Sequence, residues 1–238
     1  MGKMTRAALV RELKAAGDAT RAAQVAKYFK TGKGEYGEGD VFLGIQVPVM
    51  RRIALRYGEL PLVDLEALLD SKIHDHRAAA LEIMVRQYER GDAGQRAKLL
   101  RFYLSKTERI NNWDLVDASA RPILGEHLKT GPRGVLRKLV KSKSLWERRI
   151  AIVSTMALVW DGELEDAFEI AAALLDDRHD LIHKATGWVL REAGIVDRAR
   201  MIAFLEKHYA RVPRTTLRYA IEHLPAEDRK KILAGKFE

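Results

Sequence analysis

Apolar residues recur at intervals of three and four along nearly the whole chain, a spacing typical of amphipathic α-helices. Ala80, Ile83, Met84 and Tyr88 follow it in one segment, and residues 164–175 repeat it. No segment alternates as a strand would. The periodicity therefore predicts an all-α protein with about a dozen helices of roughly 10 to 17 residues, joined by turns of two to six residues. We expect each of the six prolines in the first turn of a helical stretch, namely Pro48, Pro61, Pro122, Pro132, Pro213 and Pro225.

Three segments of the chain resemble one another. Residues 68–83, 139–153 and 174–190 each contain an apolar pair, a polar turn and a helical pattern. Aligning the turns puts Arg77, Arg149 and Lys184 in register, at separations of 72 and 35 residues. A period of about 36 residues with two helices is typical of stacked helical pairs of the HEAT or tetratricopeptide kind. We therefore expect a superhelical solenoid of roughly six pairs, whose second helices line a concave surface.

Glycine is concentrated in one segment, residues 31–40, which contains four glycines and no apolar periodicity. Glu35, Glu38 and Asp40 would repel a phosphate, and no Lys-Ser or Lys-Thr follows, so a nucleotide-binding loop is disfavoured. We expect a flexible connector within a single domain that spans residues 1–238.

The composition restricts the chemistry of the chain. It has no cysteine, which excludes disulfides, thiolate metal sites and thiol nucleophiles. With 42 Lys and Arg against 33 Asp and Glu, the net charge is +9, so nucleic acid is the first partner to consider. No apolar run reaches membrane-spanning length and the first residues do not read as a signal peptide. We expect a soluble, cytoplasmic monomer.

The segment NNWDLVDASA carries the first candidate site. Asn112 can cap a helix beginning at Trp113, and Trp113, Asp117 and Arg121 then share one face at four-residue spacing. The alternative interpretation packs Trp113 in the core and pairs Asp117 with Arg121. Both remain open on this pattern alone.

Two further helices carry candidate residues of the same kind. Trp188 lies on the charged side of its helix, one turn after Lys184, and Arg149 lies between apolar positions, where it requires an anion such as a carboxylate or a phosphate. The surrounding stretch has one acidic residue, Glu147, and could be a phosphate-binding field or simply a solvated face. Its basic residues are Arg133, Arg137, Lys138, Lys141, Lys143, Arg148 and Arg149.

Two histidine pairs could suggest a metal site, but we expect none. His179 and His183 are four residues apart, yet His179 precedes the expected helix, with Asp180 as its cap, and no third ligand is apparent. His74 and His76 belong to the polar turn that precedes their helix. No set of two histidines and a carboxylate suits an oxidative dealkylase.

Several short sequence motifs together resemble those of the AlkD-like DNA alkylation repair glycosylases, which are built from HEAT-like repeats. FLGIQVP, NWDLVD and KATGWVLRE are the most specific, and the likeness covers nearly the whole chain. The motifs are AKYFK at 26–30, FLGIQVP at 42–48, AALEIM at 79–84, NWDLVD at 112–117, WERRIAI at 146–152, KATGWVLRE at 184–192 and TTLRYAIEHL at 215–224.

The resemblance implies that Trp113, Asp117 and Trp188 form the cleft that holds a damaged nucleotide. It also implies that Arg149, or the adjacent Arg148, lies beside the DNA backbone. The remaining residues that we assign to DNA binding are Tyr28, Lys141, Lys143, Lys184 and Arg218.

The family cuts the N-glycosidic bond of cationic N3- and N7-alkylated purines in duplex DNA, which is the first step of base excision repair. By resemblance we expect this activity here, without a cofactor, and a shallow engagement of the lesion. Convergence of Trp113, Arg149 and Trp188 on one groove is part of this expectation. The alternatives are a non-catalytic HEAT-like DNA-binding protein and a scaffold for an acidic protein partner.

Overall fold

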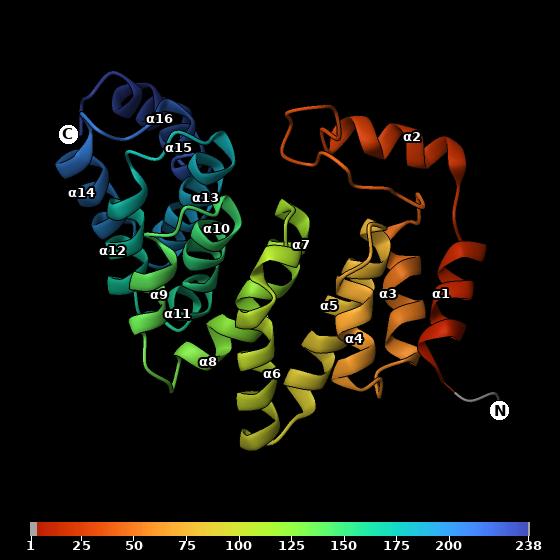
Figure 1. Ribbon diagram of the computed structural model, residues 1–238. Helices are drawn as coiled ribbons and strands as arrows, with labels where there is room; N and C mark the ends of the chain where they lie inside the picture. The colour runs from red at the N-terminus through yellow and green to blue at the C-terminus, as the bar shows by residue number, and fades with distance from the viewer. Residues whose placement is uncertain (1–3, 238) are drawn as a thin grey trace. The chain divides into compact units, whose positions relative to one another are not determined.

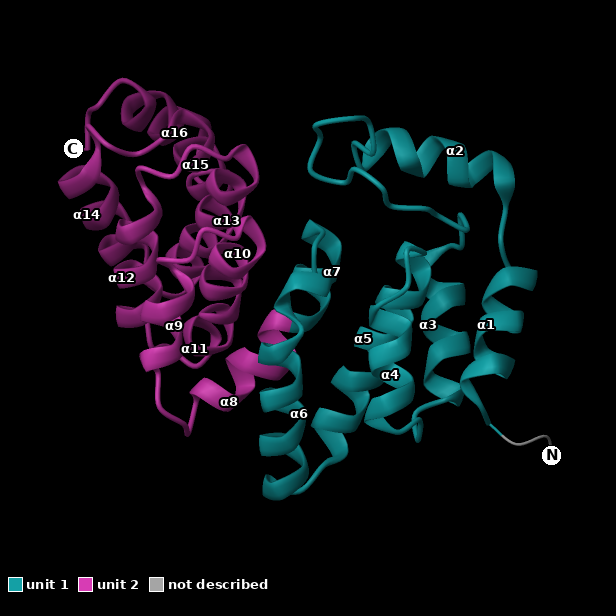
Figure 2. Cartoon of the chain, in the orientation of Figure 1, with its two compact units in different colours: residues 1–119 teal, residues 120–238 magenta. Residues whose placement is uncertain are grey.

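The structure is a computed structural model that describes residues 4–237. Within these residues the chain is all-α, as predicted, and its one β-type contact is an isolated parallel bridge between Val41 and Ile73. No described helix has the length and apolarity needed to cross a bilayer. The chain forms two compact units, residues 1–119 and residues 120–238, which are described separately below (Figure 2).

Unit 1 is built around a 17-residue helix, α5. Helices α3 and α4 pack against α5, and α1 packs beside α3. Figure 1 shows α1, α3 and α5 side by side, with α2 crossing one end of this layer. The helices of unit 1 are α1 (Arg6–Ala15), α2 (Ala19–Tyr28), α3 (Val47–Arg56), α4 (Leu62–Leu69), α5 (His74–Arg90), α6 (Ala93–Ser105), the 3₁₀ turn η1 (Thr107–Arg109) and α7 (Trp113–Ala120), whose last residue begins unit 2.

Unit 2 is built around a second 17-residue helix, α13, which packs against α10, α11, α12, α14 and α15. Gly187 allows α15 to approach α13 closely, because a Cβ atom at residue 187 would lie 2.6 Å from the Thr216 carbonyl oxygen. The elements of unit 2 are η2 (Arg121–Gly125), α8 (Glu126–Leu128), α9 (Gly134–Leu139), α10 (Leu145–Ser154), α11 (Met156–Trp160), α12 (Glu165–Leu174), α13 (Asp180–Val196), α14 (Arg198–His208), α15 (Arg214–Ala220) and α16 (Ala226–Leu233).

Side-chain caps determine where several helices begin. The hydroxyl of Thr5 accepts from the backbone N–H of Ala8, and Asp92 forms a reciprocal capping box with Gln95 at the start of α6. The hydroxyl of Ser144 accepts from the backbone N–H of Glu147 at the start of α10. Each cap satisfies backbone donors that the first helical turn leaves without partners.

The prolines lie at or next to the starts of helices with one exception, although only Pro48 lies within a first turn as predicted. Pro48 lies in the first turn of α3, Pro61, Pro213 and Pro225 directly precede helices, and Pro132 precedes α9. The prediction is wrong for Pro122, which lies inside the continuous helical stretch formed by α7, η2 and α8. Proline removes an N–H group and crowds the preceding turn, and the wider π-helical turn of η2 accommodates both effects.

The second helices repeat one local contact. Arg77 donates to the carbonyl oxygen of Ser71, and Arg148 donates to that of Ser142, each over 3.0 Å and six residues. His183 bonds the carbonyl of Asp177 over the same span. Arg77 therefore matches Arg148 rather than Arg149.

The predicted separation of 72 residues, between Arg77 and Arg149, is thus too long by one residue, because the match of Arg77 is Arg148. Both arginines follow the same apolar pair and polar turn, so the sequence pattern could not separate them. The predicted separation of 35 residues between Arg149 and Lys184 agrees with the first residues of α10 and α13, Leu145 and Asp180.

Candidate functional site

An aromatic cluster in unit 1 surrounds the start of α7. The ring of Trp113 stacks on Phe29 with 5.0 Å between centroids and an interplanar angle of 7°, and Tyr28 meets the same indole edge-on at 6.0 Å. Phe29 also contacts Phe42 and His74, at 5.0 and 5.3 Å. We call Tyr28, Phe29, Phe42, His74 and Trp113 the aromatic cluster. It supports one face of the indole, while Tyr28 remains 68% exposed.

Asp117 lies one turn after Trp113 on α7. As predicted, this helix begins at Trp113, and the Asn112 side-chain oxygen accepts from the Trp113 N–H at 2.8 Å. Trp113 and Asp117 both remain partly exposed, whereas Leu115 and Val116 between them are buried. The four-residue spacing therefore presents an indole and a carboxylate from one helical face.

Arg121, the third residue of the predicted stripe, has contacts within unit 2. Its guanidinium lies 4.8 Å from the ring centroid of Trp160 and 3.4 Å from a carboxylate oxygen of Glu126. Trp160 is itself 53% exposed and donates its indole N–H to Glu192. The predicted relation of Arg121 to Asp117, which lies in unit 1, stays a prediction.

The glycine-rich segment ends in a buried clasp formed by Asp40, Arg77 and Asn112. Arg77 donates to one oxygen of Asp40 at 2.6 Å, and Asn112 donates to the other at 3.1 Å. The side chains of Arg77 and Asp40 are only 4% and 7% exposed. The clasp joins residue 40 to the starts of α5 and α7, so the predicted flexibility of residues 31–40 can apply only to the part before Asp40.

The prediction that His74, Asp75 and His76 form the polar turn before a helix is wrong. They form the first turn of α5, and all three are buried. Asp75 accepts from the backbone N–H groups of Leu43 and Ile45, at 2.8 and 3.4 Å, and His76 bonds Ser71. Polar residues are buried here because partners from distant parts of the sequence satisfy their hydrogen bonds.

His74 pairs with Asp114, the residue that follows Trp113. Nε2 of His74 lies 2.8 Å from Oδ2 of Asp114. Burial lowers the pKa of His74 to about 3, and the positive charge of Arg77 adds to this effect. Burial also raises the pKa of Asp114 to about 7, and the charge of Asp117 contributes to the increase.

The protein itself neutralises most arginines of the basic stretch in unit 2. Arg133 pairs with Glu163 and Asp166, Arg137 with Glu169, and Arg148 with Asp177. The lysines of the stretch, Lys138, Lys141 and Lys143, are exposed. Their ammonium groups form no hydrogen bond or ion pair within residues 4–237. The cations available to a partner in this stretch are therefore Lys138, Lys141 and Lys143.

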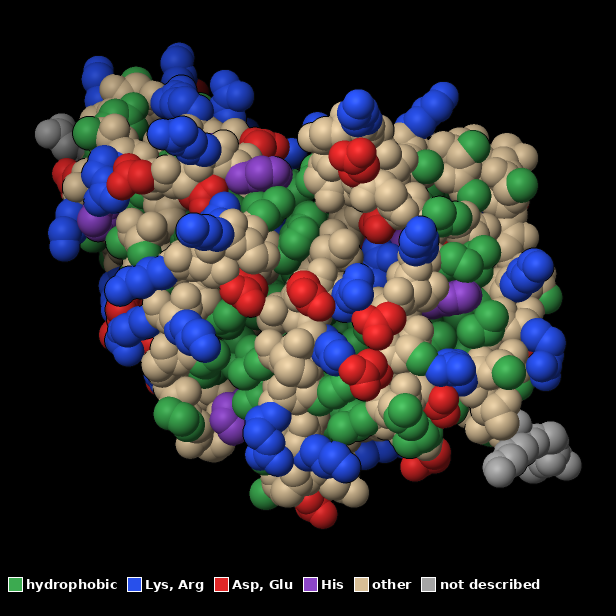
Figure 3. Space-filling view, viewed as in Figure 1, with side chains coloured by type: hydrophobic (Ala, Val, Ile, Leu, Met, Phe, Trp, Pro, Cys, Tyr) green, Lys and Arg blue, Asp and Glu red, His purple; other side chains and the backbone are tan. Residues whose placement is uncertain are grey.

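Figure 3 shows that Lys and Arg side chains are interspersed with Asp and Glu side chains on the face of the molecule that it displays. Surface pairs of this kind reduce the local field that the basic residues alone would produce, and the net charge of +9 already includes these acidic partners. The number of basic residues in a segment therefore overstates its capacity for an anionic partner.

A row of candidate residues occupies the fifth positions of the second helices in unit 2. Arg149 on α10 is 5% exposed and donates to the carbonyl of Leu181. Lys184 on α13 pairs with Asp180 at 2.8 Å, and its side chain is 41% exposed. Arg218 on α15 is exposed and forms no hydrogen bond or ion pair within the described residues.

Trp188 lies on α13, one turn after Lys184, and is partly exposed beside Gly187. Trp113 and Trp188 belong to different units, so their predicted convergence, with Arg149, on one groove stays a prediction. The roles of the other assigned residues also stay predictions.

The second histidine pair caps and closes α13. His179 precedes this helix as predicted, but the cap is His179 itself, whose Nδ1 accepts from the Leu181 N–H at 3.2 Å, and not Asp180. His183 bonds the carbonyl of Asp177. No group of three or more His, Cys, Asp or Glu residues suited to a metal ion occurs among residues 4–237.

Sequence reasoning missed several residues that shape this region, namely Phe29, His74, Asp114 and the clasp. Phe29 and Asp114 lie directly beside predicted site residues, in AKYFK and NWDLVD. Four consecutive ionisable residues, HDHR at 74–77, open a helix whose next four residues, AAAL, are apolar, and this was the available signal. Such a run at a helix start is compatible with a buried polar network as well as with a solvated turn.

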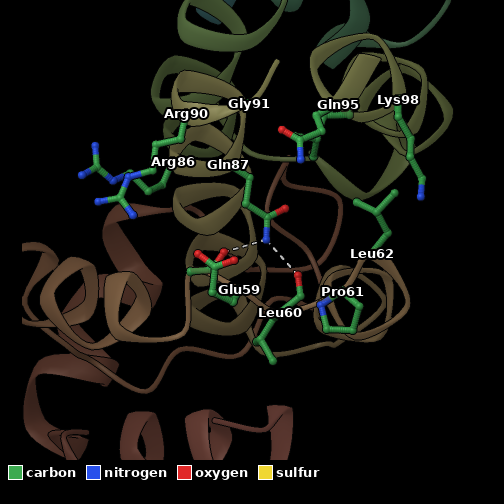
Figure 4. A pocket seen from close by; sticks show the side chains of 12 residues that line it. Glu59, Leu60, Pro61, Leu62, Arg86, Gln87, Arg90, Gly91, Gln95 and Lys98 are labelled. Carbon is green, nitrogen blue, oxygen red and sulfur yellow. Dashed lines mark hydrogen bonds between the residues drawn. The ribbon is translucent and has the colours of Figure 1, made fainter. Parts of the chain in front are cut away.

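A separate pocket of about 450 Å³ lies at the other end of α5 from His74. Gly58, Glu59 and Leu60 line one side, and Arg86, Arg90 and Lys98 contribute basic groups (Figure 4). The Gln87 amide donates to the carbonyls of Gly58 and Leu60. None of the predicted site residues lines this pocket.

Comparisons with known proteins address the family and the fold. The family model described as "DNA alkylation repair enzyme" matches residues 9–224. No curated protein matches the chain. A solved structure, "Predicted DNA alkylation repair enzyme from Enterococcus faecalis", is 17% identical, with a TM-score of 0.70, and the alignment covers 88% of this chain and 97% of that chain. The structural likeness supports the fold, and the extent of the family match shows that the chain belongs to the DNA alkylation repair enzyme family, the AlkD-like family.

Proposed function

We propose that the protein is a DNA glycosylase that removes cationic N3- and N7-alkylated purines from duplex DNA. The observation that carries this proposal is the pairing of Trp113 and Asp117 on one face of α7, with both side chains partly exposed. The aromatic cluster supports Trp113 from behind. The family match provides the wider context of DNA alkylation repair.

The reaction makes modest demands on the protein. Alkylation at N3 or N7 places a positive charge on the purine, so the base leaves with the electron pair of its bond to C1′ and becomes neutral. The deoxyribose then acquires oxocarbenium character. Water adds its oxygen to C1′ and loses a proton. A strong general acid is unnecessary, and the main need is a negative charge close to the sugar.

Asp117 can supply this negative charge. Its carboxylate would stabilise the oxocarbenium ion and orient the attacking water, which can release its proton to the carboxylate or to solvent. Trp113 would offer the free face of its indole to the sugar or the cationic base, an interaction of roughly 0.5 to 2 kcal/mol. In this proposal Trp188 provides a second aromatic contact from unit 2.

Binding of the DNA backbone falls to the cations that the protein leaves available. Lys141, Lys143 and Arg218 have no internal ion pairs among the described residues, and Lys184, which pairs with Asp180, keeps a side chain that is 41% exposed. Arg148 and Arg149 are held by a carboxylate and by carbonyl groups of the protein. These two arginines are therefore less suited to direct phosphate contacts than the lysines. Tyr28 offers an exposed ring beside Trp113.

The decisive experiment compares the wild type with Asp117→Asn on a duplex that contains N7-methylguanine. Asparagine keeps the shape of the side chain and removes its charge, so the single-turnover excision rate should fall by about 10² to 10³. Affinity for undamaged duplex should not decrease, because the change removes a negative charge. Released base is measured against a no-enzyme control that corrects for spontaneous depurination.

Asp70→Asn is the matched control, since Asp70 is a partly exposed carboxylate of unit 1 that pairs with Arg109. It should excise at the wild-type rate. Wild-type excision by a folded Asp117→Asn protein would remove Asp117 from the mechanism. A wild type that binds duplex DNA but releases no base would instead identify a DNA-binding protein without this activity.

A further inference from the structure

We propose that His74 and Asp114 form a positioning pair, which holds the first turn of α7 so that Trp113 and Asp117 keep their orientation. The inference rests on the glycosylase function proposed above. His74 and Asp114 lie outside the residues to which that function assigns contact with the nucleotide.

The geometry links three parts of unit 1 at one imidazole. The His74 ring lies 5.3 Å from the Phe29 ring and 4.5 Å from the Phe42 ring, between centroids. Its Nε2 reaches Asp114, which lies next to Trp113 in sequence. Phe29 in turn stacks on Trp113. The ring therefore joins α5, residues 29–42 and the first turn of α7.

The hydrogen bond between His74 and Asp114 has no substitute. Nδ1 of His74 and Oδ1 of Asp114 are buried and have no hydrogen-bond partner within the described residues. Loss of either side chain would leave the other with a buried polar atom and no partner, which favours movement of the α7 turn. The Asp114 side chain is 30% exposed, so the pair lies at the boundary between the core and the surface that carries Trp113.

The charged groups around the pair are Arg77 on α5, Asp117 on α7 and Asp40, which pairs with Arg77. The pKa of His74 is about 3 and that of Asp114 is about 7. Between about pH 3 and pH 7 the folded pair therefore holds one titratable proton. Below about pH 7, protonated Asp114 donates to Nε2. Above it, neutral His74 donates from Nε2 to the carboxylate. The contact therefore survives titration of the pair.

The effect on stability follows from the same values. For Asp114 alone, a raised pKa makes the fold less stable as pH rises from about 4 to 7, and for His74 alone, a lowered pKa makes it less stable as pH falls from about 6.5 to 3. The unfolded pair also holds one proton between about pH 4 and 6.5. The pair should therefore contribute no pH dependence to the free energy of unfolding in this window.

Variants can separate positioning from packing. His74→Phe keeps a ring between Phe29 and Phe42 but removes the bond to Asp114, and it should lower the single-turnover excision rate about 10- to 100-fold with little change in DNA affinity. Asp114→Ala should do the same. Asp114→Asn retains a hydrogen bond to Nε2 and should stay within about 3-fold of the wild type.

His76→Phe is the matched control, because His76 is a buried histidine of the same helix whose partner is Ser71, not α7. It should leave the rate unchanged. NMR of the His74 ring nitrogens provides a readout that needs no DNA. The ¹⁵N resonance of this ring is assigned as the one that is absent from the spectrum of His74→Phe. This resonance should shift near pH 7 in the wild type and not in Asp114→Asn.

Two results would overturn the inference. Wild-type excision by folded His74→Phe and Asp114→Ala proteins would make the pair merely structural while leaving the glycosylase function intact. A His74 resonance insensitive to Asp114→Asn would show that the pair does not form. An inactive wild type would refute the proposed glycosylase function first, and the positioning role with it.

Discussion

Replacement of Asp40 by asparagine tests the buried clasp. The variant removes the charge that faces Arg77, whose side chain is only 4% exposed, while an asparagine oxygen can still accept from Asn112. Breaking a buried ion pair by removing one partner costs about 3–5 kcal/mol, because the remaining charge cannot reach water. The Arg77 Nε is already without a hydrogen-bond partner among the described residues, which leaves the guanidinium few alternatives.

The loss should be visible in equilibrium unfolding. For a chain of this length, 3–5 kcal/mol corresponds to a decrease in Tm of roughly 6 to 20 °C. Urea unfolding followed by circular dichroism gives the change in free energy. Hydrogen exchange of residues 31–45 shows whether the opening is local, and this segment should exchange faster in Asp40→Asn than in the wild type.

The control is Asp228→Asn, which breaks an exposed pair with Arg198 and should cost no more than about 1 kcal/mol. The double variant Arg77→Met/Asp40→Leu removes both charges and should be more stable than Asp40→Asn alone. If Asp40→Asn costs no more than Asp228→Asn, burial does not determine the strength of this pair and the reasoning fails.

Two further predictions concern unit 2. Lys141→Gln/Lys143→Gln should reduce the magnitude of the slope of log affinity against log salt concentration by about 1.8, since each phosphate contact contributes about 0.9; an unchanged slope would place the phosphate contacts elsewhere. Gly187→Ala should destabilise the fold by about 1–3 kcal/mol, because the added methyl would lie 2.6 Å from a carbonyl oxygen of α15. Thermal unfolding measures this cost, and a Tm equal to that of the wild type would contradict the close approach of the two helices.

Helical periodicity and local capping predicted much of the fold. Asn112 and Trp113 mark the start of α7 as expected, because both the cap and the apolar spacing are local properties of the sequence. The one-residue error at Arg149 arose where two adjacent arginines fitted the same pattern. The contact of Arg148 with the carbonyl of Ser142, which matches that of Arg77 with Ser71, resolved this choice.

Burial of polar side chains could not be predicted in the same way. His74, Asp75 and His76 look like a polar turn before a helix until their partners at residues 43, 71 and 114 are known. A single sequence contains no direct record of such pairings. The resemblance to the family predicts Trp113 and Asp117 as site residues, and it gives no indication of the residues that contact them.

Arg77, Arg148 and His183 make the same local contact, which gives α5, α10 and α13 a common register. In each case a side chain four residues into the second helix closes back over the turn that joins the two helices of a pair. Apolar spacing tolerates a shift of one residue, whereas in all three helices the fourth residue makes this closure. A polar side chain at that position can therefore align helical pairs whose sequences have otherwise diverged.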